Sequence, residues 1–136
     1  MVGTIPIAID IQNSDLDIIC YVEDQKDFVR TVEDAFQAEK DFSIRHLNDR
    51  ELPAIVANFF IDDFEIEIFG QAVPSIQQAA YKHMLIEDYL LKKYGEAFRQ
   101  QIITLKKQGY KTEPAFALLL GLEGNPYTEL LKISTH

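Results

Sequence analysis

Over the first seventy residues, several short segments have the apolar patterns that β-strands have. Apolar residues at every second position, or in short unbroken runs, predict four strands, over 16–22, 42–47, 54–61 and 64–69. The last two are separated by Asp62-Asp63 alone, the length of a two-residue hairpin turn. We therefore expect a mixed, mostly antiparallel sheet.

Helical periodicity appears once within this region and then dominates the rest of the chain. An apolar stripe containing Phe28 and Phe36 predicts a helix over 24–38. After Gly70 the period changes to about 3.6, and Ser75 with Gln78 has the spacing of a capping box for a helix that ends at Tyr94.

Three further helices are marked by their ends. A helix over 96–108 stops at Gly109, and Thr112 is predicted to cap a short helix that ends near Gly121. Asn125-Pro126 has the form of a final helix start. The pattern predicts an α+β fold with a C-terminal helical cap.

At 136 residues the chain has the length of one domain. We expect a single domain over 1–136, with a strand-rich catalytic half over 1–70 and a helical half over 71–136. No signal peptide or membrane span is evident, and the lone Cys20 cannot form an internal disulfide, so we expect a cytoplasmic protein.

The net charge of −9 belongs to the first half of the chain. Residues 1–70 carry five Lys or Arg against sixteen Asp or Glu, whereas residues 71–136 carry eight against six. An acidic surface repels nucleic-acid backbones, so a long DNA or RNA partner is disfavoured. A nucleotide bound with a metal ion remains compatible, because the cation reverses the local charge.

The candidate functional residues are acidic side chains on two of the predicted strands. Asp15 and Asp17 point the same way from an extended backbone, and so do Glu65 and Glu67 on the second hairpin strand. If these strands are neighbours, a third carboxylate joins the aspartates, and such a group suits a divalent metal. The alternative is that these acids line a solvated sheet face. Like charges gathered on one face repel unless a cation neutralises them, which favours the metal site.

The turn Gly3-Thr4, followed ten residues later by Asp15-Leu16-Asp17 and then by a strand carboxylate, resembles the nucleotidyltransferase superfamily that includes DNA polymerase beta. The wider stretches that carry the likeness are 2–6, 14–20, 57–60, 64–71 and 112–117, and they resemble an uncharacterised bacterial branch of that superfamily, a domain of unknown function.

The resemblance implies roles for these residues. Gly3, Thr4 and Ser14 would bind the nucleotide, with the Gly3-Thr4 turn on its phosphates. Asp15 and Asp17 would bind two divalent ions, Mg²⁺ or Mn²⁺. Glu65 or Glu67 would be the third acid; both are candidate metal ligands, and we favour Glu65 as the catalytic one.

The implied activity is transfer of a nucleotidyl group, from a nucleoside triphosphate such as ATP, to a hydroxyl of a small molecule or a protein. The rival hypothesis is a non-catalytic binding module that keeps the fold, as part of a regulatory pair. The superfamily has a helix and a strand before the glycine turn, and this chain has two residues there. A missing strand would leave a sheet edge that could pair in a homodimer.

Overall fold

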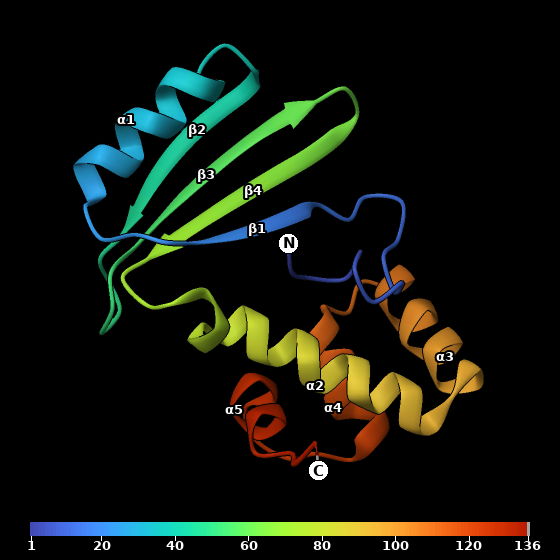
Figure 1. Cartoon of the computed structure of the whole chain (residues 1–136). Helices are drawn as coiled ribbons and strands as arrows, with labels where there is room; N and C mark the ends of the chain where they lie inside the picture. Colours follow the sequence, from blue (N-terminus) through green and yellow to red (C-terminus); the bar gives the residue numbers. More distant parts are fainter. Residues whose placement is uncertain (136) are drawn as a thin grey trace. The chain divides into compact units, whose positions relative to one another are not determined.

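The computed structural model describes residues 1–135, so His136, the last residue of the predicted domain, lies outside the described residues. Contacts group the chain into two compact units. The first contains Met1–Val2 and Asn13–Gln78, and the second contains Gly3–Gln12 and the chain from Ala79 onwards. The prediction of an α+β fold is confirmed, since a four-stranded mixed sheet is followed along the chain by helices (Figure 1). The expectation of a single domain stays a prediction.

The sheet of the first unit has the strand order β1-β4-β3-β2. Its strands are β1 (Leu16–Tyr21), β2 (Lys40–Leu47), β3 (Ala54–Ile61) and β4 (Phe64–Gln71). β1 pairs with β4 in parallel, and the other two pairs are antiparallel, so the predicted mixed sheet is confirmed. Figure 1 shows the aspartate strand β1 beside the second strand of the hairpin.

Two local features determine where the β3–β4 hairpin turns and where the first helix begins. Ile61 and Phe64 face each other across the predicted two-residue turn, in which Asp62 adopts a left-handed conformation with φ of 53°. Helix α1 (Gln25–Phe36) begins after Asp24, whose side chain accepts a hydrogen bond of 3.1 Å from the Asp27 N–H.

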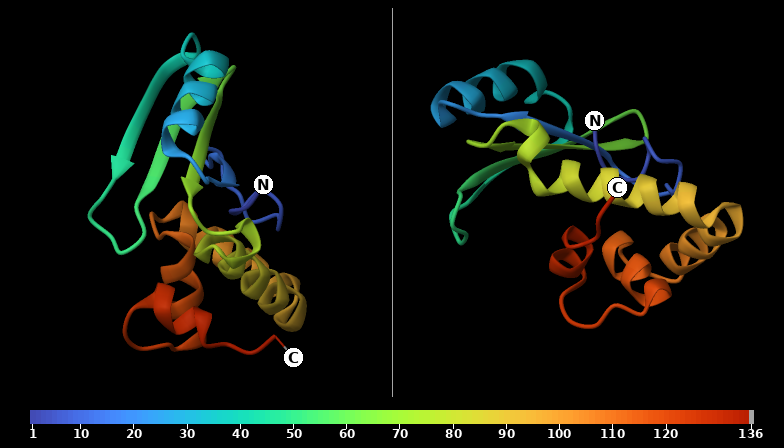
Figure 2. Two further views of the ribbon diagram at one scale, coloured as in Figure 1. Left: turned by 60° about the vertical axis from the view of Figure 1, so that its left-hand side comes forward. Right: turned by 60° about the horizontal axis from the view of Figure 1, so that its bottom comes forward.

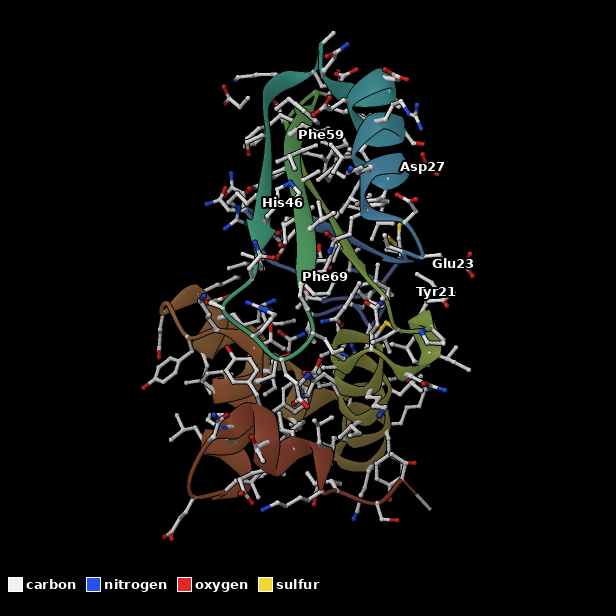
Figure 3. All side chains as sticks on the ribbon, turned by 90° about the vertical axis from the view of Figure 1, so that its left-hand side faces the viewer. Tyr21, Glu23, Asp27, His46, Phe59 and Phe69 are labelled. Carbon is white, nitrogen blue, oxygen red and sulfur yellow. The ribbon has the colours of Figure 1, made fainter. Side chains whose placement is uncertain are left out.

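Helix α1 covers one face of the sheet (Figure 2). Phe36 of α1 stacks on Phe59 of β3 with ring centroids 4.5 Å apart, and Figure 3 places Phe59 between β3 and α1. The buried centre of this layer consists of Val32, Ala57, Phe59 and Ile68. Because side chains alternate along a strand, the neighbours of these strand residues in sequence point to the opposite face.

The second unit is built from helices and from the segment Gly3–Gln12. The helices are α2 (Ala79–Tyr94), α3 (Glu96–Lys107), α4 (Thr112–Leu120) and α5 (Pro126–Leu131). Their buried core is apolar and includes Ile9, Leu91, Ile102, Phe116 and Leu130. Within residues 1–135, no helix has both the length and the apolar character that a membrane span requires.

Two cations of α3 hold the Gly3–Gln12 segment through its carbonyl groups. Arg99 donates to the carbonyl oxygens of Ile7 and Ala8, and buried Lys106 donates to that of Ile9 at 2.7 Å. Charge-assisted bonds of this kind satisfy backbone acceptors that would otherwise be buried without a partner.

Two predicted helix caps are wrong. Ser75 starts a short 3-10 turn, η1 (Ser75–Gln77), whereas α2 starts at Ala79, because Gln78 is extended with ψ of 147°. The Gln78 amide donates instead to the carbonyl oxygens of Cys20 and Val73, and these bonds hold it outside the helix. The second error concerns α4, whose N-cap is Lys111 rather than Thr112.

Candidate metal centre

Three carboxylates of the first unit lie close enough to share a cation. One oxygen atom from each of Asp15, Asp17 and Glu67 lies within 4.8 Å of the other two, and all three residues are half-buried. Asp15 directly precedes β1, and Asp17 is its second residue, so an extended backbone directs both side chains to one face.

The third carboxylate comes from the parallel neighbour strand. Glu67 of β4 is the register partner of Asp17. A register displaced by one residue would place Ile66 or Ile68 beside Asp17 instead, and would turn Glu67 toward α1. The pairing of β1 with β4 therefore assembles the cluster.

Glu65 lies outside this cluster among the described residues. It shares the sheet face of Glu67, but two residues along a strand correspond to about 7 Å, and its partner on β3 is Phe60. The structure thus brings Glu67, and not the favoured Glu65, to the two aspartates. The catalytic role assigned to Glu65 stays a prediction.

Two of the three carboxyls, those of Asp17 and Glu67, have raised pKa values. Burial, followed by the negative charge of Asp15, raises the pKa of Asp17 to about 8, and a hydrogen bond with Glu67 acts in the same direction. Burial is also the largest effect on Glu67 and raises its pKa, while Asp17 and Arg45 act in the opposite sense. Near neutral pH Asp17 therefore favours its protonated form, and a cation beside the cluster would act against this shift.

The backbone of β1 is held on its other side by the start of the chain. The Val2 N–H donates to the carbonyl oxygen of Asp17 at 2.9 Å, in an isolated antiparallel bridge. Val2 is almost completely buried, so this contact is shielded from water. This hydrogen bond restrains β1 at Asp17, whose carboxylate belongs to the cluster.

The predicted nucleotide-binding residues divide between the two units. Ser14 belongs to the first unit and precedes Asp15, whereas Gly3 and Thr4 belong to the second. Gly3 has φ of 84°, which favours glycine. The Thr4 carbonyl accepts a hydrogen bond from the Ile9 N–H at 3.1 Å, which closes a compact loop. Binding of phosphate by these residues stays a prediction.

A model of a family described as a domain of unknown function (DUF4269) matches residues 1–133. The chain belongs to this family. No curated protein and no solved structure matches it. The match covers the cluster, the whole first unit and the second unit of this DUF4269 domain as far as residue 133.

The acidic triad of this DUF4269 domain could bind a metal ion. Oxygens that coordinate one Mg²⁺ at about 2.1 Å lie about 3–4 Å apart, so the carboxylates need to close only slightly around an ion. Carboxylate oxygens are hard ligands, which suit Mg²⁺, Mn²⁺ or Ca²⁺ better than a metal that prefers sulfur.

Sequence reasoning missed two polar residues on the same sheet face, Asn58 of β3 and Arg45 of β2. Asn58 is the register partner of Glu67, and it accepts a hydrogen bond of 3.2 Å from Arg45. The signal in the sequence is a polar amide inside the otherwise apolar strand Ala54–Ile61.

Two further residues of this DUF4269 domain with reactive side chains, Cys20 and His83, are at least partly buried. Burial raises the pKa of the Cys20 thiol, which disfavours the nucleophilic thiolate. His83 is buried, and its Nε2 lies 2.8 Å from the carbonyl oxygen of Tyr127. This is the environment of a side chain that packs within the helices.

Proposed function

We propose that this DUF4269 domain is a metal-dependent nucleotidyltransferase of the superfamily that includes DNA polymerase beta. The observation that carries the proposal is the triad Asp15, Asp17 and Glu67, whose oxygens gather within 4.8 Å on a parallel strand pair. The spacing of Gly3-Thr4 from the Asp-x-Asp pair supports it from the sequence.

The triad residues would hold Mg²⁺ or Mn²⁺ together with the phosphates of a nucleoside triphosphate. Divalent ions bound there would lower the pKa of the attacking hydroxyl and neutralise charge on the leaving pyrophosphate. The three carboxylates would fix the ions, since Asp15 and Asp17 share one backbone segment and Glu67 is held by the neighbouring strand. The acceptor would be a hydroxyl of a small molecule or a protein.

The charge of the cluster argues against a purely structural role. Like-charged carboxylates directly opposite each other destabilise a sheet, and the negative charge of Asp15 adds to burial, the largest cause, in raising the pKa of Asp17. A binding function for a cation explains why three acids gather on one sheet face.

The first test is calorimetric titration of Mg²⁺ or Mn²⁺ with a non-hydrolysable ATP analogue into the wild-type chain and into Asp17→Ala. We expect metal-dependent nucleotide binding that Asp17→Ala abolishes and that Asp34→Ala, an exposed aspartate of α1, leaves intact. Release of pyrophosphate from ATP then tests turnover. Nucleotide binding without turnover would favour the non-catalytic module, and no metal-dependent binding by wild type would overturn the proposal.

A further inference from the structure

A polar row crosses the sheet on the face opposite α1. The register pairs Asp17 with Glu67 and Glu67 with Asn58. The sequence neighbours of Glu67 and Asn58, such as Ile68 and Phe59, pack in the α1 layer, so the polar residues themselves face the other way. The row thus leads from the triad, on β1 and β4, to the central strand β3.

Arg45 of β2 extends this row by a side-chain contact. Its Nη2 donates to Oδ1 of Asn58 at 3.2 Å. Arg45 makes no ion pair within residues 1–135, although its half of the chain is rich in carboxylates. Its positive charge does act on Glu67, where it favours the ionised carboxylate.

The hydrogen bond from Arg45 fixes the directions in which the oxygen and the nitrogen of the Asn58 amide point. The oxygen and the nitrogen of an amide group point in different directions from its carbon, and here the oxygen is directed to β2. The Nδ2–H donors of the same amide point away from that contact, and Glu67 is the register partner of Asn58 on β4. We propose that Asn58, held by Arg45, is a positioning residue that orients the Glu67 carboxylate for metal binding; this inference rests on the metal site of the proposed function.

This arrangement has a general chemical basis. Carboxylates that ligate a metal are commonly hydrogen-bonded by an outer layer of residues, which sets their direction. Loss of such a partner typically lowers metal affinity by about 10–100-fold. Asn58 lies on β3, which is paired on both edges, so its backbone is well placed to hold that direction.

The first arm of the test measures Mn²⁺ affinity of the full chain by electron paramagnetic resonance, which counts free Mn²⁺. We expect Asn58→Val to lower the affinity by about 10–100-fold and Arg45→Gln to lower it in the same direction. Arg30→Gln is the matched control, because it removes the same charge from exposed α1, and it should bind Mn²⁺ like wild type.

The second arm separates positioning from a merely structural role and needs no variant of Asn58. In the metal-free ¹⁵N-labelled chain, the side-chain NH₂ signals of Asn58 should shift when Glu67→Gln is introduced. Those of Asn125, which caps α5 in the other unit, should stay in place.

The outcomes discriminate between the two proposals. Tight Mn²⁺ binding by wild type, with Asn58→Val within twofold of it or with Asn58 NH₂ signals indifferent to Glu67→Gln, would overturn the positioning role and leave the metal site intact. No Mn²⁺ binding by wild type would overturn both. Loss of affinity in Asn58→Val together with the shifted NH₂ signals would support the inference.

Discussion

Asp17 of β1 and Glu67 of β4 are register partners in a parallel strand pair, and one carboxylate oxygen of each lies within 4.8 Å of the other. Each is half-buried, and Asp15 adds a third charge beside them. Protonation of Asp17 would neutralise the charge that a bound cation would also neutralise, so proton and metal should compete for this cluster.

Metal binding should therefore release a proton. Because the pKa of Asp17 is raised to about 8, apparent Mn²⁺ affinity should increase between pH 6 and 8 and level off above that range. The limit for one displaced proton is about tenfold per pH unit. Calorimetry at pH 7 in buffers of different ionisation enthalpy measures the number of protons released. A binding enthalpy that is independent of the buffer would contradict this expectation.

The metal-free chain should lose stability as pH rises. The pKa of the Asp17 carboxyl is about 8 in the folded chain and about 3.8 in the unfolded chain. Its contribution to the free energy of unfolding is therefore complete below pH 3.8 and is lost as the pH rises through about 8. Asp17→Asn removes this dependence and should exceed wild type at pH 8 by about 0.2–1 kcal/mol, the range for cross-strand side-chain pairs. Urea denaturation with EDTA at pH 5 and pH 8 tests it, with Asp34→Asn on α1 as the control.

The two glutamates of β4 should differ sharply in metal binding. Glu67→Gln should weaken Mn²⁺ affinity by more than about 100-fold, because even outer partners of a metal ligand contribute about 10–100-fold. Glu65→Gln makes the same chemical change two residues away and should alter affinity by less than about threefold, as expected of a charge outside the cluster in water. Equal losses in both variants would show that Glu65 also ligates the metal.

Gly70 should tolerate no side chain. A Cβ built there would lie 2.6 Å from Cγ2 of Val22 and 2.8 Å from the Phe28 ring of α1. Gly70→Ala should therefore destabilise the chain by about 1–3 kcal/mol through overpacking, measured by urea denaturation. Phe28→Leu shortens the opposing side chain, and in that background Gly70→Ala should cost less. An equal cost in both backgrounds would mean that another contact is responsible.

The second unit holds a buried acid that should be sensitive to alkaline pH. Glu87 of α2 is 2 % exposed, and its Oε1 has no hydrogen-bond partner among the described residues. Burial raises its pKa well above 4.5; Glu113 of α4 acts in the same sense, and Lys106 of α3 opposes it. Because the pKa of Glu87 is higher in the folded chain than in the unfolded chain, protonated Glu87 contributes stability at acid pH. This contribution is lost as the pH rises through the folded-state pKa of Glu87.

Glu87→Gln keeps the shape and removes the charge, so it should flatten this decline. We expect it to stabilise the chain at pH 9 by at least about 1 kcal/mol, the lower end of the cost of a buried group without a partner. Thermal denaturation at pH 5 and pH 9 measures the difference. Glu123→Gln, at an exposed position, should show the wild-type pH dependence.

The strands and helices could be predicted because their signals are local. The segment 54–61 is a short apolar run, 64–68 alternates strictly, and Gly95 and Gly121 mark helix ends, so these elements lie where the pattern predicts them. The capping box at Ser75 failed for a non-local reason. The Gln78 amide bonds to Cys20, which is 58 residues away, and this contact outweighs the local helical preference.

The candidate site was predictable in part. Asp15 and Asp17 are neighbours in sequence, so their shared direction follows from the strand alone. The choice between Glu65 and Glu67 depends on the register of β4 against β1, which no local pattern determines. Asn58 and Arg45 belong to strands that are distant in sequence from the aspartates, and their place beside the triad follows from the strand order.

The two-residue turn at Asp62-Asp63 has a chemical consequence although it carries no ligand. It sets the register of β4 on β3, and β1 then pairs with β4. Insertion of one residue into this turn would shift that register, and because successive side chains alternate, it would replace Glu67 with an isoleucine on the aspartate face. The length of a surface loop thus determines whether the three carboxylates come together, and homologues with a longer turn would be expected to lose the triad without any substitution of an acid.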